Sequence, residues 1–336
     1  MSRDHYQEIT DRIVAALEGG DVAPWQRPWK ASSLGGVPRN AATGRPYRGI
    51  NVWLTLMTQW ERGYDHPLWL SFKQANELAG RAMRRAGRKV EQNKRGRWVF
   101  ADGEDKGKTC GGIRAGQNKD NGCGGTDVIF WKPMKGREAQ DDGTHREFSW
   151  LLMRSYNVFN IAQCDQHVVD FVCGEVAPED AFQPLAAAER ICEGYEIQTV
   201  HGGDRAFYRP ATDTIHLPRR EAFHSPEHYY TTRFHEMGHS TGAASRLSRD
   251  GIAKFDYQGS HQYAEEELVA EFTACFLAGE AGIVRTVEGN AAGYLRHWAA
   301  KLREDPKIVV LAAQRAQKAA DLILGRSAHK AESEAA

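Results

Sequence analysis

The sequence has few of the features that would place the chain in a membrane or an oxidising compartment. Its 336 residues include six cysteines, and no two of them form a Cys-x-x-Cys pair, so redox and zinc motifs of that spacing are excluded. Cys110 and Cys123, each followed by two glycines, are the only pair that looks related. No apolar run approaches the ~20 residues of a membrane span, and no signal-peptide apolar region follows the N-terminus. We expect a cytoplasmic protein with free thiols.

The charge of the chain sums to zero but is unevenly distributed. Residues 1–160 carry 26 Lys and Arg against 18 Asp and Glu, whereas residues 161–336 carry 18 against 26. At this length two domains are expected, each with enough chain for a core of its own. Halves of opposite sign indicate two roles, and the basic half indicates a polyanionic partner.

We predict an α+β protein with two domains. The first, residues 1–162, has strand patterns at 126–132 and 147–159 that would close a small curved sheet, with a basic, glycine-rich insert at about 84–125. Residues 163–184 contain charge and proline with little periodicity and are interpreted as a linker. Residues 185–326 form the second domain, and 327–336 a disordered tail.

Eight of the nine tryptophans precede residue 151. Burial is the usual role of tryptophan, yet Trp25 and Trp29 lie in a proline-broken segment beside Arg27 and Lys30. Aromatic faces that stack on bases, with cations along the phosphates, hold single strands without reading their sequence. From the residues alone, nucleic-acid binding and a basic solvated surface remain equally open. The candidate DNA contacts are Trp25, Arg27, Trp29, Lys30, Arg39, Asn40, Arg45, Tyr47, Arg48 and Asn51.

The second half contains the pattern His-Glu-x-x-His at residues 235–239. Two residues four apart on a helix lie ~40° apart in azimuth and ~6 Å apart in rise, so both imidazoles can meet one metal ion. The glutamate between them, Glu236, is then held beside a water on the metal, as a general base. Ser225 is a suitable N-cap, Pro226 a suitable first helical residue, and Gly242 a stop signal.

A third metal ligand is expected from a following helix. Glu267 and Glu271 are four residues apart on a segment whose apolar continuation faces protein, and buried carboxylates need a cation. We assign His235, His239 and Glu267 as ligands, Glu236 as the catalytic base, and Glu271 as an acceptor for the free N–H of a ligand histidine. A further donor to the oxyanion could be Tyr263, His261 or Tyr257. Zinc is the expected ion, with Mn²⁺ or Co²⁺ also suited to these ligands.

Two sequence blocks together resemble a known family. Residues 38–40, 43–51 and 72–75 resemble the N-terminal domain of ArdC antirestriction proteins, which also occurs in TraC primases of conjugative plasmids. Residues 235–242 and 263–271 resemble the metallopeptidase domain of the same proteins, gluzincin-like in its downstream glutamate. The resemblance implies a single-stranded-DNA-binding domain joined to a zincin-like domain, in a protein that shields a mobile element from host restriction. The insert is longer and more basic than the family pattern, and Ala243 replaces a common histidine.

Two functions follow as alternatives. In the first, the metal centre hydrolyses peptide bonds in an unknown protein or peptide substrate, with Glu236 taking a proton from water. In the second, the DNA-binding domain alone shields DNA and the metal is structural, although a structural site has no use for Glu236. A third reading, an accessory piece of a primase, is weak because no nucleotidyl-transfer carboxylate cluster is present.

Overall fold

The structure, a computed structural model, describes residues 4–19, 23, 37–114, 124–139, 145–174, 184–253, 261–283 and 292–326. Contacts between residues divide the chain into two compact units. Unit 1 comprises Met1–Pro38, Pro46–Met57 and Pro178–Ser327, and unit 2 comprises Arg39–Arg45 and Thr58–Ala177. Both helices and sheets are present, which confirms the predicted α+β class with two domains. No helix among the described residues is long and apolar enough to span a bilayer.

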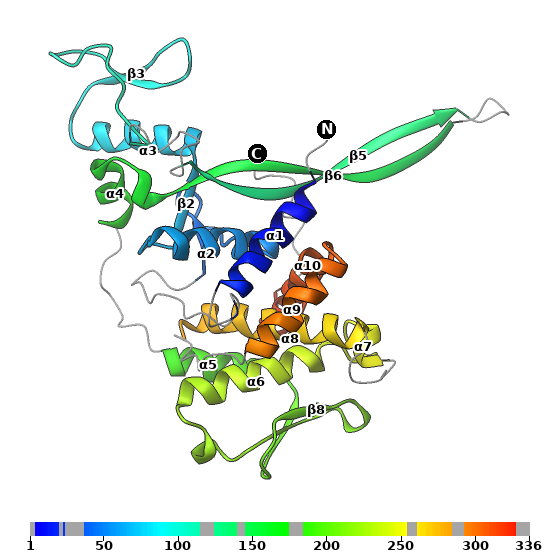
Figure 1. Cartoon of the computed structure of the whole chain (residues 1–336). Helices are drawn as coiled ribbons and strands as arrows, with labels where there is room; N and C mark the ends of the chain where they lie inside the picture. Colours follow the sequence, from blue (N-terminus) through cyan, green and yellow to red (C-terminus); the bar gives the residue numbers. More distant parts are fainter. Residues whose placement is uncertain are drawn as a thin grey trace. The chain divides into compact units, whose positions relative to one another are not determined.

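Unit 2 is built on a four-stranded sheet of order β1-β2-β6-β5. The two short strands β1 (Arg39–Asn40) and β2 (Leu68–Ser71) are parallel. The two long strands β5 (Thr126–Ala139) and β6 (His145–Asn160) form an antiparallel ribbon, which extends away from the rest of the sheet (Figure 1). Trp69 and Leu70 on β2 are fully buried and form the centre of this unit's core.

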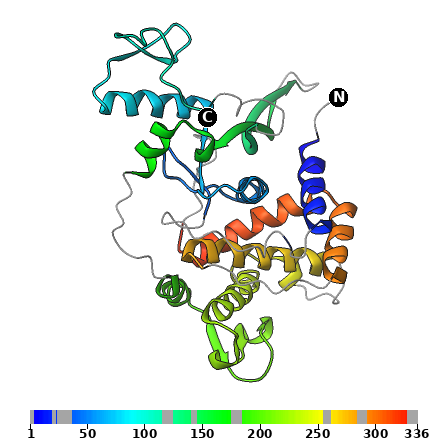
Figure 2. The same ribbon diagram turned by 60° about the vertical axis from the view of Figure 1, so that its left-hand side comes forward.

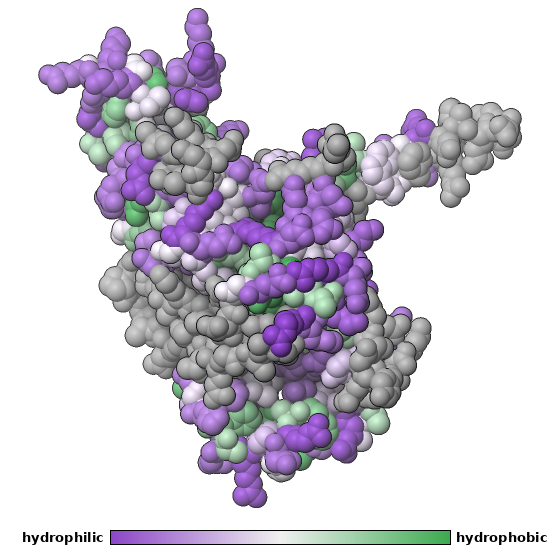
Figure 3. Space-filling view, viewed as in Figure 1, coloured by the Kyte–Doolittle hydropathy of each residue, from purple (hydrophilic) through white to green (hydrophobic). Residues whose placement is uncertain are grey.

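Helix α3 (Phe72–Arg85) begins directly after β2, because Ser71 caps it in a capping box with Gln74. The predicted insert then forms a hairpin of β3 (Val90–Gln92) and β4 (Trp98–Phe100). Trp98 of this hairpin lies on α3 at Gly80, where a Cβ would come within 2.3 Å of the indole. The part of the insert that the structure describes is therefore an ordered, hydrophilic layer over α3 (Figure 3).

The predicted linker needs one correction. Residues Gln166–Cys173 form helix α4, which packs against α3 in unit 2. Val168 is fully buried, and Arg81 and Arg85 lie over the ring of Phe171. A helix of eight residues has little more than two turns, which is too short for a clear hydrophobic period in the sequence. Its stability comes mainly from its packing on α3. Residues 175–183 are outside the described part, and the predicted domain ranges as a whole stay a prediction.

Unit 1 is mainly helical. Its central helix α8 (His261–Ala281) packs against α6 (Pro226–Ser240), α10 (Ile308–Ile323), α5 (Pro184–Gly194) and the short α7 (Asp250–Ala253) (Figure 2). The N-terminal helix α1 (His5–Glu18) packs against α9 (Ala292–Glu304) and therefore belongs to this unit, although the sequence places it in the first domain. Helix α2 (Ile50–Arg62) starts in unit 1, where Trp53 is buried against Phe272 and Phe276.

A three-stranded sheet precedes α6 in unit 1. Its order is β7 (Gln198–His201), β9 (Thr214–Leu217), β8 (Phe207–Arg209), so that β8 is an edge strand. The last two strands form a hairpin, in which β8 and β9 pair antiparallel. Asp213 at its turn has a positive φ of 49°. Both β8 and β9 contact α6, which brings the edge of this sheet to the helix with the histidine pair.

Candidate metal centre

Helix α6 places the two histidines of the His-Glu-x-x-His pattern. The side chain of Ser225 accepts a hydrogen bond from the backbone N–H of His228 at 3.2 Å, and Pro226 is the first helical residue. These contacts confirm the predicted start of the helix. His235 lies nine residues after Pro226 and His239 one turn later, with their Nε2 atoms 3.1 Å apart. Both rings therefore present a nitrogen to one point.

Helix α8 supplies a carboxylate to the same point. Glu267 Oε2 lies 3.6 Å from His235 Nε2, and Glu267 Oε1 lies 3.4 Å from His239 Nε2. One ligand atom from each of the three residues lies within 4.8 Å of the others. Ligands at ~2.1 Å from one tetrahedral ion would be ~3.4 Å apart. The spacing and the chemistry of the three donors fit a divalent cation.

The close contact of α6 and α8 depends on Gly238. A Cβ at this position would lie 3.1 Å from Ala270 Cα and 3.2 Å from Thr273 Cβ. These distances are at the steric limit, so the absence of a side chain lets the two helices approach closely enough for Glu267 to reach the histidines. Gly238 therefore positions the candidate ligands without contacting them.

The electrostatics of the cluster favour a cation. Burial alone would raise the pKa of Glu267, yet hydrogen bonds with His235 and His239 outweigh it and hold this pKa well below its usual range. Burial would likewise lower the pKa of His239, but hydrogen bonds to Glu266 and Glu267 raise it to about 10. The site thus stabilises positive charge between these side chains.

Glu266, which the sequence reasoning missed, supports the second histidine. His239 Nδ1 lies 3.3 Å from Glu266 Oε1. Because a carboxylate only accepts, Nδ1 of His239 carries a proton, which leaves Nε2 as the nitrogen that would bind a metal. Glu266 is in turn held by Arg249, whose Nε and Nη2 donate to its two oxygens at 2.7 and 2.6 Å. Both side chains are almost completely buried.

Glu271, the predicted acceptor for the free N–H of a ligand histidine, lies near His235 but beyond hydrogen-bond distance. Glu271 Oε1 lies 3.9 Å from His235 Nδ1, which is longer than a hydrogen bond. The structure therefore brings Glu271 towards the Nδ1 side of His235 without closing a hydrogen bond. The role that the sequence assigns to Glu271 stays a prediction, whereas the equivalent contact at His239 is made by Glu266.

Of the other predicted site residues, the structure describes the side chains of the base Glu236 and of one candidate oxyanion donor, Tyr263. Glu236 is buried at 6% exposure. The pKa of Tyr263 is raised to about 12, first by burial and then by the charge and hydrogen bond of Glu267 and the charge of Glu236. Its hydroxyl therefore stays protonated and can donate a hydrogen bond. His261 is the first residue of α8, but its side chain is outside the described part, as is Tyr257.

The predicted DNA contacts separate into three groups. Trp25, Arg27, Trp29 and Lys30 are outside the described residues. In unit 2, Arg39 and Asn40 form β1, the Asn40 side-chain amide donates to Gln74 Oε1 at 3.0 Å, and Arg45 is exposed. In unit 1, the side chains of Tyr47 and Asn51 are buried at 8% and 7% exposure, so neither presents a free surface to DNA.

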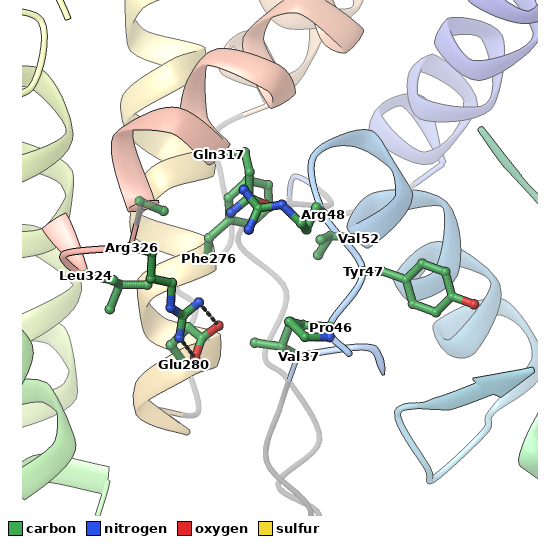
Figure 4. Close-up of a pocket in the computed structure, with 11 residues that line it drawn as sticks. Val37, Pro46, Tyr47, Arg48, Val52, Phe276, Glu280, Gln317, Leu324 and Arg326 are labelled. Carbon is green, nitrogen blue, oxygen red and sulfur yellow. Dashed lines mark hydrogen bonds and ion pairs between the residues drawn. The ribbon is translucent and has the colours of Figure 1, made fainter. Parts of the chain in front are cut away.

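Arg48 has an acidic partner within unit 1. Its guanidinium donates to the carboxylate of Asp321 on α10. Together with Tyr47 it lines a hollow (Figure 4), where Arg326 pairs with both oxygens of Glu280 at 2.9 Å. Each described arginine of this hollow already has a carboxylate, so it provides no open phosphate site.

A helix with two histidines one turn apart, met by a glutamate from a later helix, defines unit 1 as a zincin-like metallopeptidase domain. The family model with that description, zincin-like metallopeptidase, matches residues 186–315. Residues 3–159 match the model of the N-terminal domain of the anti-restriction factor ArdC. The chain belongs to the family of ArdC-type antirestriction proteins.

Relatives of known structure agree with this assignment. The metal-free crystal structure of the antirestriction protein ArdC from plasmid R388 is 30% identical, with a TM-score of 0.66 over 96% of this chain and 97% of that one. The same protein has also been crystallised with Mn(II), and this form gives a TM-score of 0.64 at 28% identity, over 98% of this chain and 100% of that one.

Two curated sequences extend the comparison. The protein y4eC of Sinorhizobium fredii is 30% identical over 95% of this chain and 91% of its own length. The DNA primase TraC of Escherichia coli is 33% identical over 96% of this chain, which spans only 27% of TraC. The similarity is therefore to about a quarter of the primase.

Proposed function

We propose that this chain is an antirestriction protein of a mobile element that binds single-stranded DNA through unit 2 and hydrolyses peptide bonds at the metal centre of unit 1. The observation that carries the peptidase half is the cluster of His235, His239 and Glu267 with the buried Glu236 beside it. The plasmid origin of the R388 relative supports the mobile element, and the cytoplasm is where such a protein would meet incoming DNA.

His235, His239 and Glu267 would hold the metal. The expected ion is Zn²⁺, and the Mn(II) form of the R388 relative supports a divalent cation more generally. When bound, such an ion supplies a Lewis acid that polarises a carbonyl and makes water more acidic. Glu266 would fix the orientation and tautomer of His239, as a carboxylate behind a metal-bound histidine does in other proteins.

The side chains around the cluster divide the proton transfers between them. Glu236 takes a proton from the attacking water and delivers it to the leaving amine. Tyr263 is our choice for the donor to the developing oxyanion, because its hydroxyl is protonated and lies near both Glu267 and Glu236. Edge strand β8 contacts α6 and would pair with an extended peptide through main-chain hydrogen bonds.

Support for DNA binding comes from α3 and the insert. Exposed guanidinium groups lie over aromatic rings, at 4.2 Å for Arg84 and Trp98 and 5.5 Å for Arg97 and Phe72. A nearby hollow has no acidic residue in its lining, which comprises Phe72, Asn76, Arg97, Thr109, Gly111, Gly112, Ile113 and Arg114. Arginines and accessible rings on one surface are the chemistry that holds single strands.

The rival function is shielding of DNA by unit 2, with a metal in unit 1 that only stabilises the fold. The carboxylate of Glu236 favours the peptidase, because it occupies the position of the base and a structural site does not use one. The Glu236→Gln variant distinguishes the two in a restriction-protection assay during DNA transfer. Loss of protection, with metal and single-strand binding intact, supports proteolysis, and full protection would leave shielding as the function.

The identity of the metal is tested separately. Elemental analysis of protein purified without added metal is expected to find about one zinc per chain. The His239→Ala variant is the control and is expected to lose the ion, because it removes one of the three ligands. A stoichiometry that His239→Ala leaves unchanged would place the ion elsewhere and refute the assigned ligands.

A further inference from the structure

The outer part of the β5–β6 ribbon is paired only with itself. The two strands pair from Thr126 with Val158 to Ala139 with His145. Strand β2 reaches only Val158–Asn160 of this ribbon, and no other described strand pairs with it. A two-stranded ribbon is marginally stable in water by itself. The large side chains on the outer part of the ribbon are therefore not explained by packing in a sheet core.

The register assigns each side chain to one of two faces. Residues directly opposite each other in an antiparallel pair lie on the same face, and successive residues alternate. One face carries the pairs Val128 with Tyr156, Phe130 with Arg154, Lys132 with Leu152, and Met134 with Trp150. The other carries Ile129 with Ser155, Trp131 with Met153, and Lys135 with Ser149, and Pro133 also lies on it.

The first face combines large exposed rings with cations. Trp150 is 43% exposed and Tyr156 is 40% exposed, both high values for residues of this size. The rings of Phe130 and Tyr156 meet edge to face, with centroids 5.4 Å apart, and Lys132 and Arg154 are exposed between the aromatic positions. We call these five residues the ribbon face.

The charge of the ribbon face indicates the chemistry of its partner. Residues 128–134 and 150–156 contain Lys132 and Arg154 and no acidic residue. Neighbouring positions on one face of a strand are ~6.8 Å apart, so rings and cations alternate along the ribbon at short intervals. A polyanion with flat, unpaired rings along it matches both properties, because bases stack on the rings and phosphates lie on the cations.

We propose that the ribbon face of Phe130, Lys132, Trp150, Arg154 and Tyr156 is a binding surface for single-stranded DNA, on which unpaired bases stack against Trp150 and Tyr156. This inference rests on the proposed single-strand binding by unit 2 and assigns part of it to residues that are not among the DNA contacts predicted from the sequence, all of which precede residue 52. A duplex, whose bases are already stacked in pairs, offers no face to these rings and binds the ribbon face weakly.

The test measures binding of the full-length protein to a fluorescent oligothymidine, with variants on the two faces. Trp150→Ala and Tyr156→Ala are each expected to weaken binding by about 5- to 100-fold, the loss typical of one stacked base. Trp150→Phe keeps a ring and is expected to restore most of the affinity. Met153→Ala, on the opposite face of the same strand, is the matched control and is expected to change binding by less than about twofold.

The cations are tested through the dependence on salt. Lys132→Ala is expected to lower the slope of log K against log salt by about 0.7, the contribution of one phosphate contact on a single strand, and the double variant with Arg154→Ala by about 1.4. Lys135→Ala is the control, because it removes the same charge from the same strand, three residue pairs further along the ribbon and on the other face. Its slope is expected to stay that of the unmodified protein.

Each result decides between distinct conclusions. Equal effects of Trp150→Ala and Met153→Ala, or of Lys132→Ala and Lys135→Ala, would overturn the ribbon face while leaving single-strand binding by unit 2 intact. A wild-type protein that binds no oligothymidine would refute the proposed DNA binding itself. Light scattering provides the remaining arm: ribbon-face variants that change only the oligomeric state would assign the face to a second copy of the chain, against the proposal.

Discussion

The buried pair of Arg249 and Glu266 supports a quantitative prediction about the metal centre. Arg249 donates to both oxygens of Glu266, and also to Thr241 Oγ1 at 2.7 Å and to the carbonyl of Gly238 at 2.8 Å. The Arg249 side chain is 8% exposed and that of Glu266 is 5% exposed. Replacement by methionine would leave the carboxylate buried with only His239 as a described partner.

The Arg249→Met variant is expected to lose about 3–5 kcal/mol of unfolding free energy, because removal of one partner leaves an uncompensated charge. The measurement is urea denaturation of the metal-free protein at neutral pH. The double variant Arg249→Met, Glu266→Leu removes both charges and is expected to recover much of this loss, since an apolar pair of similar volume replaces a buried ion pair at little cost.

Metal affinity separates the two roles of Glu266. Glu266→Gln removes the acceptor that fixes the proton on His239 Nδ1, and it is expected to lower metal affinity by about 10- to 100-fold. The double variant, although more stable than Arg249→Met, is expected to keep this low affinity. The reasoning would be refuted by an Arg249→Met variant that loses less than about 1 kcal/mol, or by normal metal affinity in Glu266→Gln.

Three further predictions concern the same centre. Glu236→Gln is expected to bind metal normally and to lose peptide cleavage by at least about 100-fold, measured with a peptide library; cleavage at the normal rate would exclude Glu236 as the base. Gly238→Ala places a methyl against Ala270 and Thr273 and is expected to cost about 1–3 kcal/mol, and an unchanged melting temperature would contradict the close helix contact. Saturation with Zn²⁺ at about 100 times its dissociation constant should stabilise the protein by ~2.7 kcal/mol, an increment that EDTA removes if the ion binds the folded form.

The sequence predicted that the two histidines of the candidate metal centre lie together, because their arrangement within one helix is set by spacing alone. His235 and His239 share a face of α6 whatever the rest of the fold does. The three successive glutamates of α8 show the limit of this reasoning. A helix turns ~100° per residue, so Glu265 meets Arg315, Glu266 meets Arg249, and Glu267 meets the histidines. The partner of each glutamate depends on where residues after α6, such as Arg249, lie in the fold. The hydrophobic period of α8 does not contain this information.

The length of the ribbon also exceeded the prediction. Strand patterns at 126–132 and 147–159 stop short of β5, which continues to Ala139 through Pro133 and Gly136. Both residue types normally indicate the end of a strand. Pro133 is tolerated because β5 is an edge strand, where a missing N–H leaves no neighbour unpaired. The sequence cannot distinguish an edge strand from a central one before the sheet order is known.

The charges around the candidate metal centre bear on the proposed roles of Glu267 as a ligand and Glu236 as a base. Arg249 compensates Glu266, and Arg246 is held by Asp213 and the carbonyl of Ser240, so neither arginine approaches Glu267 in the described structure. Glu236 and Glu267 then lie beside two imidazoles with no arginine or lysine as an ion-pair partner among the described contacts. Buried carboxylates without a cation are costly, and an ion of charge +2 balances two of them. The same arrangement favours a divalent over a monovalent cation, and it places Glu236, which is not among the proposed ligands, beside that cation as the proposed base.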